Sequence, residues 1–203
     1  MGVDEMEKIL FTPLSEKDVV DLDLGEVVYL TGTIYTARDE AHLRALELHH
    51  EGKKTPVDFS SSAVFHCGPI AVKKGDAWEV VAAGPTTSTR MNNMEPEFIE
   101  KFHPRAIIGK GGMSAPTVEA MKKFGCVYLA ITGGAAVLAA KGIRKVSGVE
   151  WYDLGMPEAL WIFEAQKFGP LIVGIDAHGG SLFAQVDKEV EANLPRVKAR
   201  LGI

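Results

Sequence analysis

The chain has 203 residues, of which 46% are hydrophobic and 24% charged, a composition typical of a globular protein rather than a disordered or fibrous one. No apolar run approaches the roughly 18 to 20 residues of a membrane span, and a formal charge of -5 argues against a nucleic-acid-binding surface. Residues 1–8 are acidic and polar and lack the apolar core of a signal peptide, so we expect a cytoplasmic protein.

The first half of the sequence predicts a strand, a helix and a hairpin. Residues 26–35 are rich in β-branched and aromatic side chains, which favours a strand. Thr36 to Asp39 match the Ser/Thr-x-x-acid capping pattern, which predicts a helix from there to about His50. Residues 69–72 and 78–83 alternate apolar and polar side chains around a Lys-Gly-Asp turn, a pattern typical of a β-hairpin.

From about Glu95 the pattern changes to strand–glycine–helix units. Strands are expected at residues 105–108, 126–131, 150–153 and 171–176. Helices are expected at residues 114–124, just after residues 132–134, at 157–166 and at about 187–200. Parallel units of this kind behind a β-rich first half predict the α/β class, as a layered domain with mixed sheets.

Nothing in the sequence divides the chain into parts. It contains no internal repeat, low-complexity stretch or linker-like segment, so we expect a single domain over residues 1–203. Cys67 and Cys126 are far apart in the sequence and each lies among apolar neighbours. Buried free thiols are therefore expected, and neither a disulfide nor a metal site.

Polar side chains follow several predicted strands, where open α/β sheets place their ligands. Arg38 lies in the first turn of a predicted helix, a position that the helix dipole disfavours for a cation. An anion bound by both the guanidinium and the helix N-terminus would resolve this conflict. The alternative is a solvated Arg38 that pairs with a nearby Asp or Glu.

A second cluster lies in the segment GPTTSTRM, residues 84–91, directly after the predicted hairpin. Thr86 and Thr87 belong to a run of four hydroxyl side chains that could orient a small polar ligand. Arg90 could bind a carboxylate through two hydrogen bonds. Lys110 lies in a glycine-rich loop that enters a helix, where backbone N–H groups can approach an anion. A solvated loop and a structural turn are the alternatives for these two segments.

The histidines give weaker indications. Asp176 and His178 could form a catalytic pair, although a turn built on Asp and Gly explains them as well. His49, His50 and His103 have polar neighbours and are expected at the surface, whereas His66 is expected in or near the core rather than as a metal ligand. The residues alone therefore predict an acidic chain with three cations, Arg38, Arg90 and Lys110, that bind a small polyanion.

Five segments together resemble the β subunit of the class I fumarate hydratase and L(+)-tartrate dehydratase family, whose one-chain members carry the same unit as their C-terminal domain. These segments are TGTIYTARDEAH, GPTTSTRM, IIGKGGM, AITGGAA and LGMPEALW. They occur in the expected order, and the resemblance covers about residues 14–186. It implies a swivelling β/β/α fold, which suits the mixed pattern above.

The resemblance also implies a reversible hydro-lyase that interconverts (S)-malate and fumarate, or converts tartrate to oxaloacetate. In that family a [4Fe-4S] cluster with one open iron binds the substrate hydroxyl and a carboxylate. Its three cysteines belong to the α part, and this chain has no such set. We therefore expect a hetero-oligomer with an α subunit that holds the cluster, and no cluster or metal ligand in this chain.

Carried over position by position, the resemblance places Arg38, Arg90 and Lys110 on the substrate carboxylates, with Thr87 beside them. It places Thr86 as the base that removes the C3 proton, although a Thr hydroxyl is a poor base without help from its neighbours. Of the two substrates, fumarate is preferred here only because fumarase is the commoner metabolic role. A tartrate dehydratase β subunit and a non-enzymatic dicarboxylate-binding module remain the alternatives.

Overall fold

The computed structural model describes residues 7–203. The prediction that the N-terminal segment is not a signal peptide concerns residues 1–8, and residues 1–6 of that segment lie outside the described residues. Within the described part, no helix is both long and apolar enough to cross a membrane.

Seven strands form one mixed sheet in the order β1-β2-β3-β6-β7-β9-β8. They are β1 Lys8–Phe11, β2 Val27–Thr36, β3 Ala63–Phe65, β6 Ala106–Gly109, β7 Val127–Ala130, β8 Ile143–Glu150 and β9 Leu160–Ile175. The first five are parallel, and β9 is antiparallel to its neighbours. Because β9 pairs with β2 as well as with β7, strands β2, β3, β6, β7 and β9 close into a barrel.

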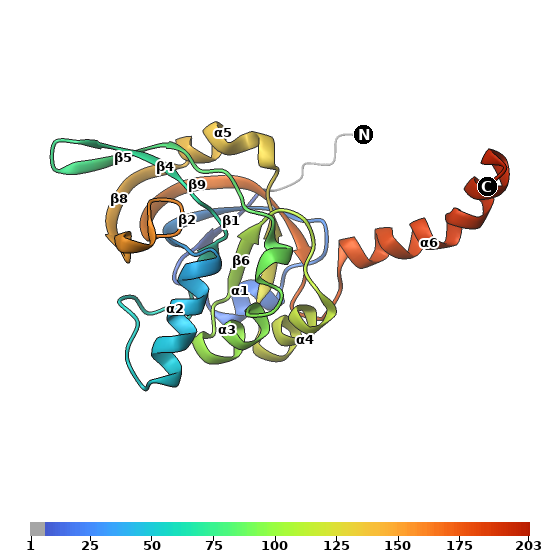
Figure 1. Cartoon of the computed structure of the whole chain (residues 1–203), viewed down its shortest axis with the longest axis horizontal. Coiled ribbons are helices and arrows are strands. Elements are labelled where there is room, and N and C mark those ends of the chain that lie inside the picture. The colour runs from blue at the N-terminus through green and yellow to red at the C-terminus, as the bar shows by residue number, and fades with distance from the viewer. Residues whose placement is uncertain (1–6) are drawn as a thin grey trace.

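The helices and a separate hairpin cover this barrel (Figure 1). The helices are α1 Glu16–Val20, α2 Asp39–His50, α3 Glu95–Phe102, α4 Ala115–Phe124, α5 Ala136–Lys141 and α6 Leu182–Leu201, and the hairpin is β4 Ile70–Lys74 with β5 Ala77–Ala82. Helices α2, α3 and α4 lie on one side, whereas the hairpin and α5 lie on the other, and α6 projects away from the body.

The central strands are buried on both faces, which explains their continuous apolar runs. In β6, Ala106 and Ile108 belong to one core cluster, whereas Ile107 between them belongs to a second. Val64 of β3 and Tyr128 of β7 lie in that second cluster, together with residues of α2, α3 and α4. Successive side chains of a strand point to opposite faces of the sheet, so one set forms a core inside the barrel and the other set forms a core under the helices.

The predicted α/β class with mixed sheets is confirmed, but two predicted elements are wrong. The segment 157–166, expected as a helix, is mostly the first half of β9, because Trp161, Phe163 and Ala165 are buried in alternation with more exposed neighbours. The burial of residues 161–166 follows a period of two, although residues 159–163 are all apolar. The strand expected at residues 150–153 is also wrong. Strand β8 lies earlier in the chain and ends at Glu150, and residues Tyr152–Leu154 form a 3-10 turn.

The start of α2 also differs from the prediction. The helix begins at Asp39 after Arg38, and no side chain caps it. The hydroxyl of Thr36, expected to cap the helix, instead donates to Ala159 O at 3.3 Å and accepts from Trp161 N at 3.0 Å. This side chain therefore connects β2 with β9, which brings the segment before β9 next to the start of α2.

Candidate functional site

The carboxyl ends of the parallel strands β2, β3, β6 and β7 meet at one edge of the sheet, where α/β proteins place ligands. Arg38 follows β2, Lys110 follows β6, and the segment of Gly133 follows β7. The topology therefore brings two of the predicted cations to the same edge, although 71 residues that belong to other elements separate them in sequence.

The segment that carries Thr86, Thr87 and Arg90 runs across this edge. The backbone N–H of Thr86 donates to His66 O at 2.6 Å, just after β3. Thr87 forms a parallel bridge with Lys110, and Ser88 N donates to Lys110 O at 3.0 Å. The five predicted site residues Arg38, Thr86, Thr87, Arg90 and Lys110 thus lie on adjoining segments of one edge.

Two of the three cations are already paired with carboxylates. Arg90 binds Asp39 through Nε, 3.1 Å from Oδ1, and Nη2, 3.0 Å from Oδ2, and about half of its side chain is exposed. Arg38 Nη2 lies 3.0 Å from Glu158 Oε1. The other oxygen of Glu158 accepts from Glu40 N at 3.2 Å, so this carboxylate is the anion at the start of α2. Arg38 therefore pairs with a nearby glutamate, although its side chain is mostly buried rather than solvated.

Lys110 differs from the two arginines because, across residues 7–203, no carboxylate lies within ion-pair distance of its Nζ. Three cations against the two carboxylates Asp39 and Glu158 leave the edge with one net positive charge. One glycine keeps space open here, and a second lies beside Lys110. A Cβ at Gly68 would lie 2.5 Å from Arg38 Nη1, and one at Gly133 would lie 3.4 Å from Lys110 Nζ.

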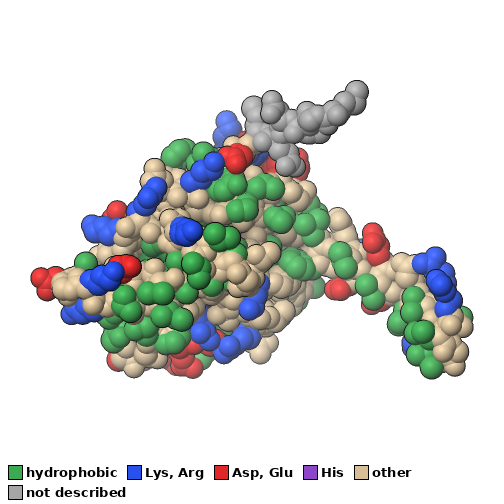
Figure 2. Space-filling view, turned by 90° about the horizontal axis from the view of Figure 1, so that it is seen from above, with side chains coloured by type: hydrophobic (Ala, Val, Ile, Leu, Met, Phe, Trp, Pro, Cys, Tyr) green, Lys and Arg blue, Asp and Glu red, His purple; other side chains and the backbone are tan. Residues whose placement is uncertain are grey.

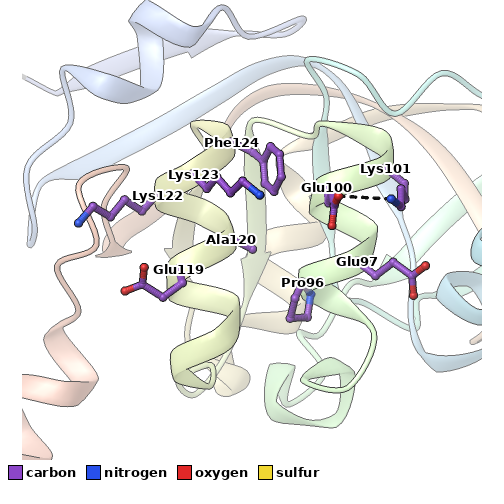
Figure 3. A pocket seen from close by; sticks show the side chains of 9 residues that line it. All are labelled: Pro96, Glu97, Glu100, Lys101, Glu119, Ala120, Lys122, Lys123 and Phe124. Carbon is purple, nitrogen blue, oxygen red and sulfur yellow. Dashed lines mark hydrogen bonds and ion pairs between the residues drawn. The ribbon is translucent and has the colours of Figure 1, made fainter.

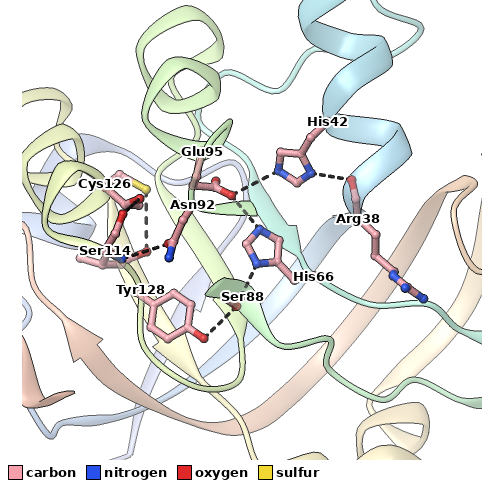
Figure 4. Close-up of polar contacts among 11 residues, drawn as sticks. Arg38, His42, His66, Ser88, Asn92, Glu95, Ser114, Cys126 and Tyr128 are labelled. Carbon is pink, nitrogen blue, oxygen red and sulfur yellow. Dashed lines mark hydrogen bonds and ion pairs between the residues drawn. The ribbon is translucent and has the colours of Figure 1, made fainter. Parts of the chain in front are cut away.

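Beneath this edge lies a fully buried cluster of two histidines and one glutamate (Figure 4). Glu95, the first residue of α3, places Oε2 at 3.4 Å from His42 Nε2 and at 3.0 Å from His66 Nε2. Neither ring N–H lies in line with this oxygen, so these are electrostatic contacts rather than linear hydrogen bonds. His42 comes from α2 and His66 follows β3, so the cluster joins three elements.

The far side of each ring connects the cluster to the site. His42 Nδ1 lies 2.8 Å from Arg38 O, and His66 Nδ1 lies 2.9 Å from Ser88 Oγ, which in turn lies 2.9 Å from Tyr128 OH. A Cβ at Gly109 would lie 2.0 Å from Ser88 Oγ, so only glycine fits there. The chain of contacts therefore runs from Arg38, the residue just before α2, to the segment that carries Thr86 and Arg90.

Chemistry assigns the protons in this chain. A carbonyl only accepts, so His42 Nδ1 must carry a proton, and its Nε2, facing a carboxylate, must carry one as well. His42 is therefore an imidazolium. His66 needs only one proton, on Nε2 toward Glu95, because its Nδ1 can accept from Ser88 Oγ–H while Ser88 accepts from Tyr128 O–H. One positive and one negative charge then share the buried space.

The pKa shifts agree with this assignment. Burial alone would raise the pKa of Glu95, but the two imidazoles outweigh it and lower the pKa to about 2. Burial alone would lower the pKa of His42, but the Glu95 carboxylate outweighs it and raises that pKa. For His66, burial prevails over the same carboxylate, and its pKa is lowered.

Comparison with known proteins places this arrangement in a family. The family model described as the fumarase C-terminus matches residues 3–186. This chain belongs to the fumarase C-terminus family.

Its relatives are named as hydratases and dehydratases. The β subunit of L(+)-tartrate dehydratase from Escherichia coli K12 is 46% identical over 183 residues, 90% of each chain. A Methanocaldococcus jannaschii protein named provisionally as the same subunit is 48% identical over 185 residues, 91% of this chain and 95% of its own length. A Geobacillus stearothermophilus protein named provisionally as a class I fumarate hydratase is 39% identical over 190 residues, 93% of this chain but 36% of that protein.

The family resemblance implies a [4Fe-4S] cluster, and the described residues of this chain offer few suitable ligands for it. Cys67 and Cys126 are free, buried thiols, as predicted, and burial raises the pKa of both. Neither is therefore suited to ligate a cluster at the exposed edge. His42, His66 and Glu95 could hold a metal ion, since their ligand atoms lie within 4.8 Å of one another. They offer three side chains, however, where a structural zinc site takes four ligands, and we interpret them as a charge cluster.

Other candidate residues lie elsewhere. The carboxylate of Asp176 accepts from the backbone N–H groups of His178 and Gly180, and His178 Nε2 contacts Val20 O, so this pair builds a turn. His49, His50 and His103 are exposed, as predicted, and His66 is buried. A groove of about 800 Å³ between α3 and α4 contains none of the site residues (Figure 3). Its wall carries three acidic and three basic side chains, a poor match for a dianion.

Sequence reasoning missed Glu95, Glu158 and the pairing role of Asp39. Glu95 stands at the start of an unpredicted helix, and no motif connects it with two histidines 53 and 29 positions earlier. Glu158 lay in the segment that was expected to be a helix, so its approach to Arg38 could not be anticipated. The available signal was LGMPEALW itself, a segment that the family resemblance contains but to which no role was given.

We expect Glu95→Gln to destabilise the chain by about 3 to 5 kcal/mol near neutral pH, because it leaves a buried imidazolium without its counter-charge. The pKa of Glu95 is about 2 in the folded chain against an ordinary 4.5. Its contribution is therefore complete above pH 4.5 and is lost as the pH falls toward 2. Urea unfolding of wild type at a series of pH values should show this acid slope, and Glu95→Gln should flatten it.

His42 acts above that window, and His66 acts from pH 6.5 downward. The raised pKa of His42 adds stability below 6.5 that is lost as the pH rises through its folded pKa, whereas the lowered pKa of His66 acts in the opposite direction. Glu97→Gln is the matched control, because Glu97 also contacts a histidine, His50, but both are exposed. An equal cost for the two variants, or a stoichiometric metal ion in the purified protein, would contradict the charge cluster.

Proposed function

We propose that this chain is the β subunit of a hydro-lyase that interconverts (S)-malate with fumarate and water. In this proposal it supplies the substrate-binding cations to a site that it shares with an α subunit. The observation that carries the proposal is the convergence of Arg38, Arg90 and Lys110 with Thr86 on one sheet edge. The names of the relatives, all dehydratases or hydratases, support the reaction class.

The cations suit the two ends of a dicarboxylate. Lys110, free of a carboxylate among the described residues, would bind one end as a point charge. The half-exposed guanidinium of Arg90 keeps N–H groups open beside those that Asp39 occupies, so it can bind the other end without losing its orientation. Arg38, held by Glu158 and less exposed, would complete the site from the start of α2.

Removal of the C3 proton builds negative charge on the neighbouring carboxylate. Lys110 and Arg90 would stabilise that charge because they are already oriented by the chain. Thr86 is the candidate base. Its backbone is fixed at both ends, since Thr86 N donates to His66 O and Thr86 O accepts from Lys110 N. No carboxylate or imidazole contacts its hydroxyl among residues 7–203, so its basicity would depend on the nearby cations.

The cluster would be held by the α subunit, where it would act as a Lewis acid on the departing hydroxyl. Burial of both cysteines in this chain supports that division. The edge that carries the cations is partly open, and a second chain closing over it would exclude water and strengthen each ion pair with the substrate. The isolated chain is therefore expected to bind dicarboxylates weakly and to catalyse nothing.

The first test compares the chain alone with the chain reconstituted anaerobically with an α subunit that bears the three cysteines, iron and sulfide. We expect fumarate formation from (S)-malate, followed by ultraviolet absorbance, only in the mixture. Tartrate serves as the second substrate, since two of the relatives are named for it, and turnover of tartrate alone would reassign the specificity. Binding of malate without turnover in any mixture would instead identify a non-enzymatic carboxylate-binding module.

Arg90→Ala should lower kcat/KM of the assembled enzyme by roughly 100-fold or more, because a charge-assisted contact to the substrate is lost. The absorbance of the cluster should remain unchanged. Arg44→Ala is the matched control: Arg44 also binds an aspartate, Asp153, through two hydrogen bonds at 2.8 and 2.7 Å, but it lies further along α2. Full activity in Arg90→Ala would exclude Arg90 from the substrate site.

Thr86→Val keeps the shape of the side chain and removes only its hydroxyl. If Thr86 takes the C3 proton, kcat should fall by roughly 100-fold with little change in KM, whereas Thr86→Ser should retain most activity. Exchange of the C3 hydrogen of malate with deuterium from solvent, followed by NMR, reports proton removal directly. Undiminished exchange in Thr86→Val would assign the base to another group.

A further inference from the structure

Helix α6, Leu182–Leu201, leaves the body of the molecule after its first turn (Figures 1 and 2). Ser181 caps it, and Phe183 anchors its root, with its ring 6.0 Å from that of Tyr128. None of its residues is buried. Such a helix is only marginally stable alone in water, because most helix stability comes from packing of an apolar face. The arm therefore needs a partner along its length.

The arm carries an apolar face suited to another helix. This stripe consists of Val186, Val190, Leu194, Val197 and Leu201, which recur every three or four residues and whose side chains are 44 to 67% exposed. That spacing places all five on one side of the helix. Pro195 lies on the opposite side at this periodicity and does not interrupt the stripe.

Charges on the arm are divided between its two halves. The half nearer the body carries the three acids Asp187, Glu189 and Glu191 and a single base, Lys188, whereas the outer half carries only the bases Arg196, Lys198 and Arg200. Figure 2 shows acidic side chains closer to the body and basic ones at the tip. A parallel pair of such helices would align acids with acids and bases with bases, whereas an antiparallel pair aligns opposite charges.

We propose that α6 pairs with α6 of a second copy of this chain in antiparallel orientation. With the twofold axis between Asn193 and Leu194, Val186 faces Leu201 and Val190 faces Val197 of the other copy. The two bodies then lie at opposite ends of the pair, separated by the length of a 20-residue helix, about 30 Å.

This register also matches the charges on both flanks of the stripe. At 3.6 residues per turn, Asp187, Glu191 and Lys198 lie on one flank. Flanks of the same kind meet in an antiparallel pair, so Lys198 of one copy enters between Asp187 and Glu191 of the other.

The second flank is arranged in the same way with the signs reversed. Glu189 of one copy lies between Arg196 and Arg200 of the other. The twofold axis repeats each set, so six of the seven charges of each arm are matched, and the seventh, Lys188, lies on the side of the helix away from the stripe. The match depends only on the sequence of α6 and its exposed stripe, and it is independent of the proposed enzyme function.

The test is sedimentation equilibrium of the full chain over a roughly hundredfold range of concentration, without any other subunit. We expect a reversible monomer–dimer equilibrium that Val190→Asp/Val197→Asp abolishes. Because no residue of α6 is buried, this variant should keep the thermal stability of the body. Val137→Asp is the matched control, since Val137 is equally exposed, at 61%, but belongs to α5.

Two further variants test the charges and the orientation. Lys198→Glu should weaken the dimer by about tenfold, and adding Asp187→Lys and Glu191→Lys should restore it. Val186→Cys and Leu201→Cys chains should form a mixed disulfide when combined under mild oxidation, while the buried native cysteines stay reduced.

Three results would overturn the proposal. They are a chain that stays monomeric at every concentration, a Val186→Cys chain that forms disulfides with itself in preference to Leu201→Cys, and a stripe variant whose only defect is loss of binding to the α subunit. The last result would show that α6 binds the α subunit rather than a second copy of this chain.

Discussion

The carboxylate of Glu95, buried between two imidazoles, is the interaction on which the arrangement of the site depends. It stands at the start of α3 and contacts His42 from α2 and His66 behind β3. Removal of any one partner would leave an unpaired charge or an unpaired ring nitrogen in the core, which costs more than the pair itself contributes. The same rings hold Arg38 O and Ser88 Oγ on their far sides, so the two segments that carry the arginines cannot move independently.

Above this cluster, the arginines are oriented by carboxylates rather than left free. Asp39 and Glu158 each cost the site one unit of positive charge, but they fix guanidinium groups that would otherwise lose rotamer entropy when a ligand binds. Lys110 carries the remaining net charge. A site with one excess positive charge attracts a dianion only weakly, which is consistent with the proposed division of the site between two subunits.

Elements could be predicted correctly from the sequence where a local residue pattern alone determines the structure. The strand of residues 26–35, the hairpin and the helix after Ser114 each depend on side chains close together in the chain. The three cations are predicted in the same local way, from the glycine and hydroxyl residues around them. Pairings across the fold could not be found in this way. The approach of Glu158 to Arg38 depends on β9 running antiparallel beside β2, and that pairing joins residues more than 120 positions apart.

The C-terminal arm and the site share a root, yet their contacts can be separated. Phe183 packs near Gly112 and Tyr128, and the Tyr128 hydroxyl ends the chain of contacts that begins at His42. Beyond that first turn, α6 touches nothing that orients the cations. Loss of the outer stripe therefore removes only apolar contacts between arms, whereas a change at Phe183 would disturb the packing beneath Ser88. Assembly through the arm and the packing beneath Ser88 thus depend on different residues of one helix.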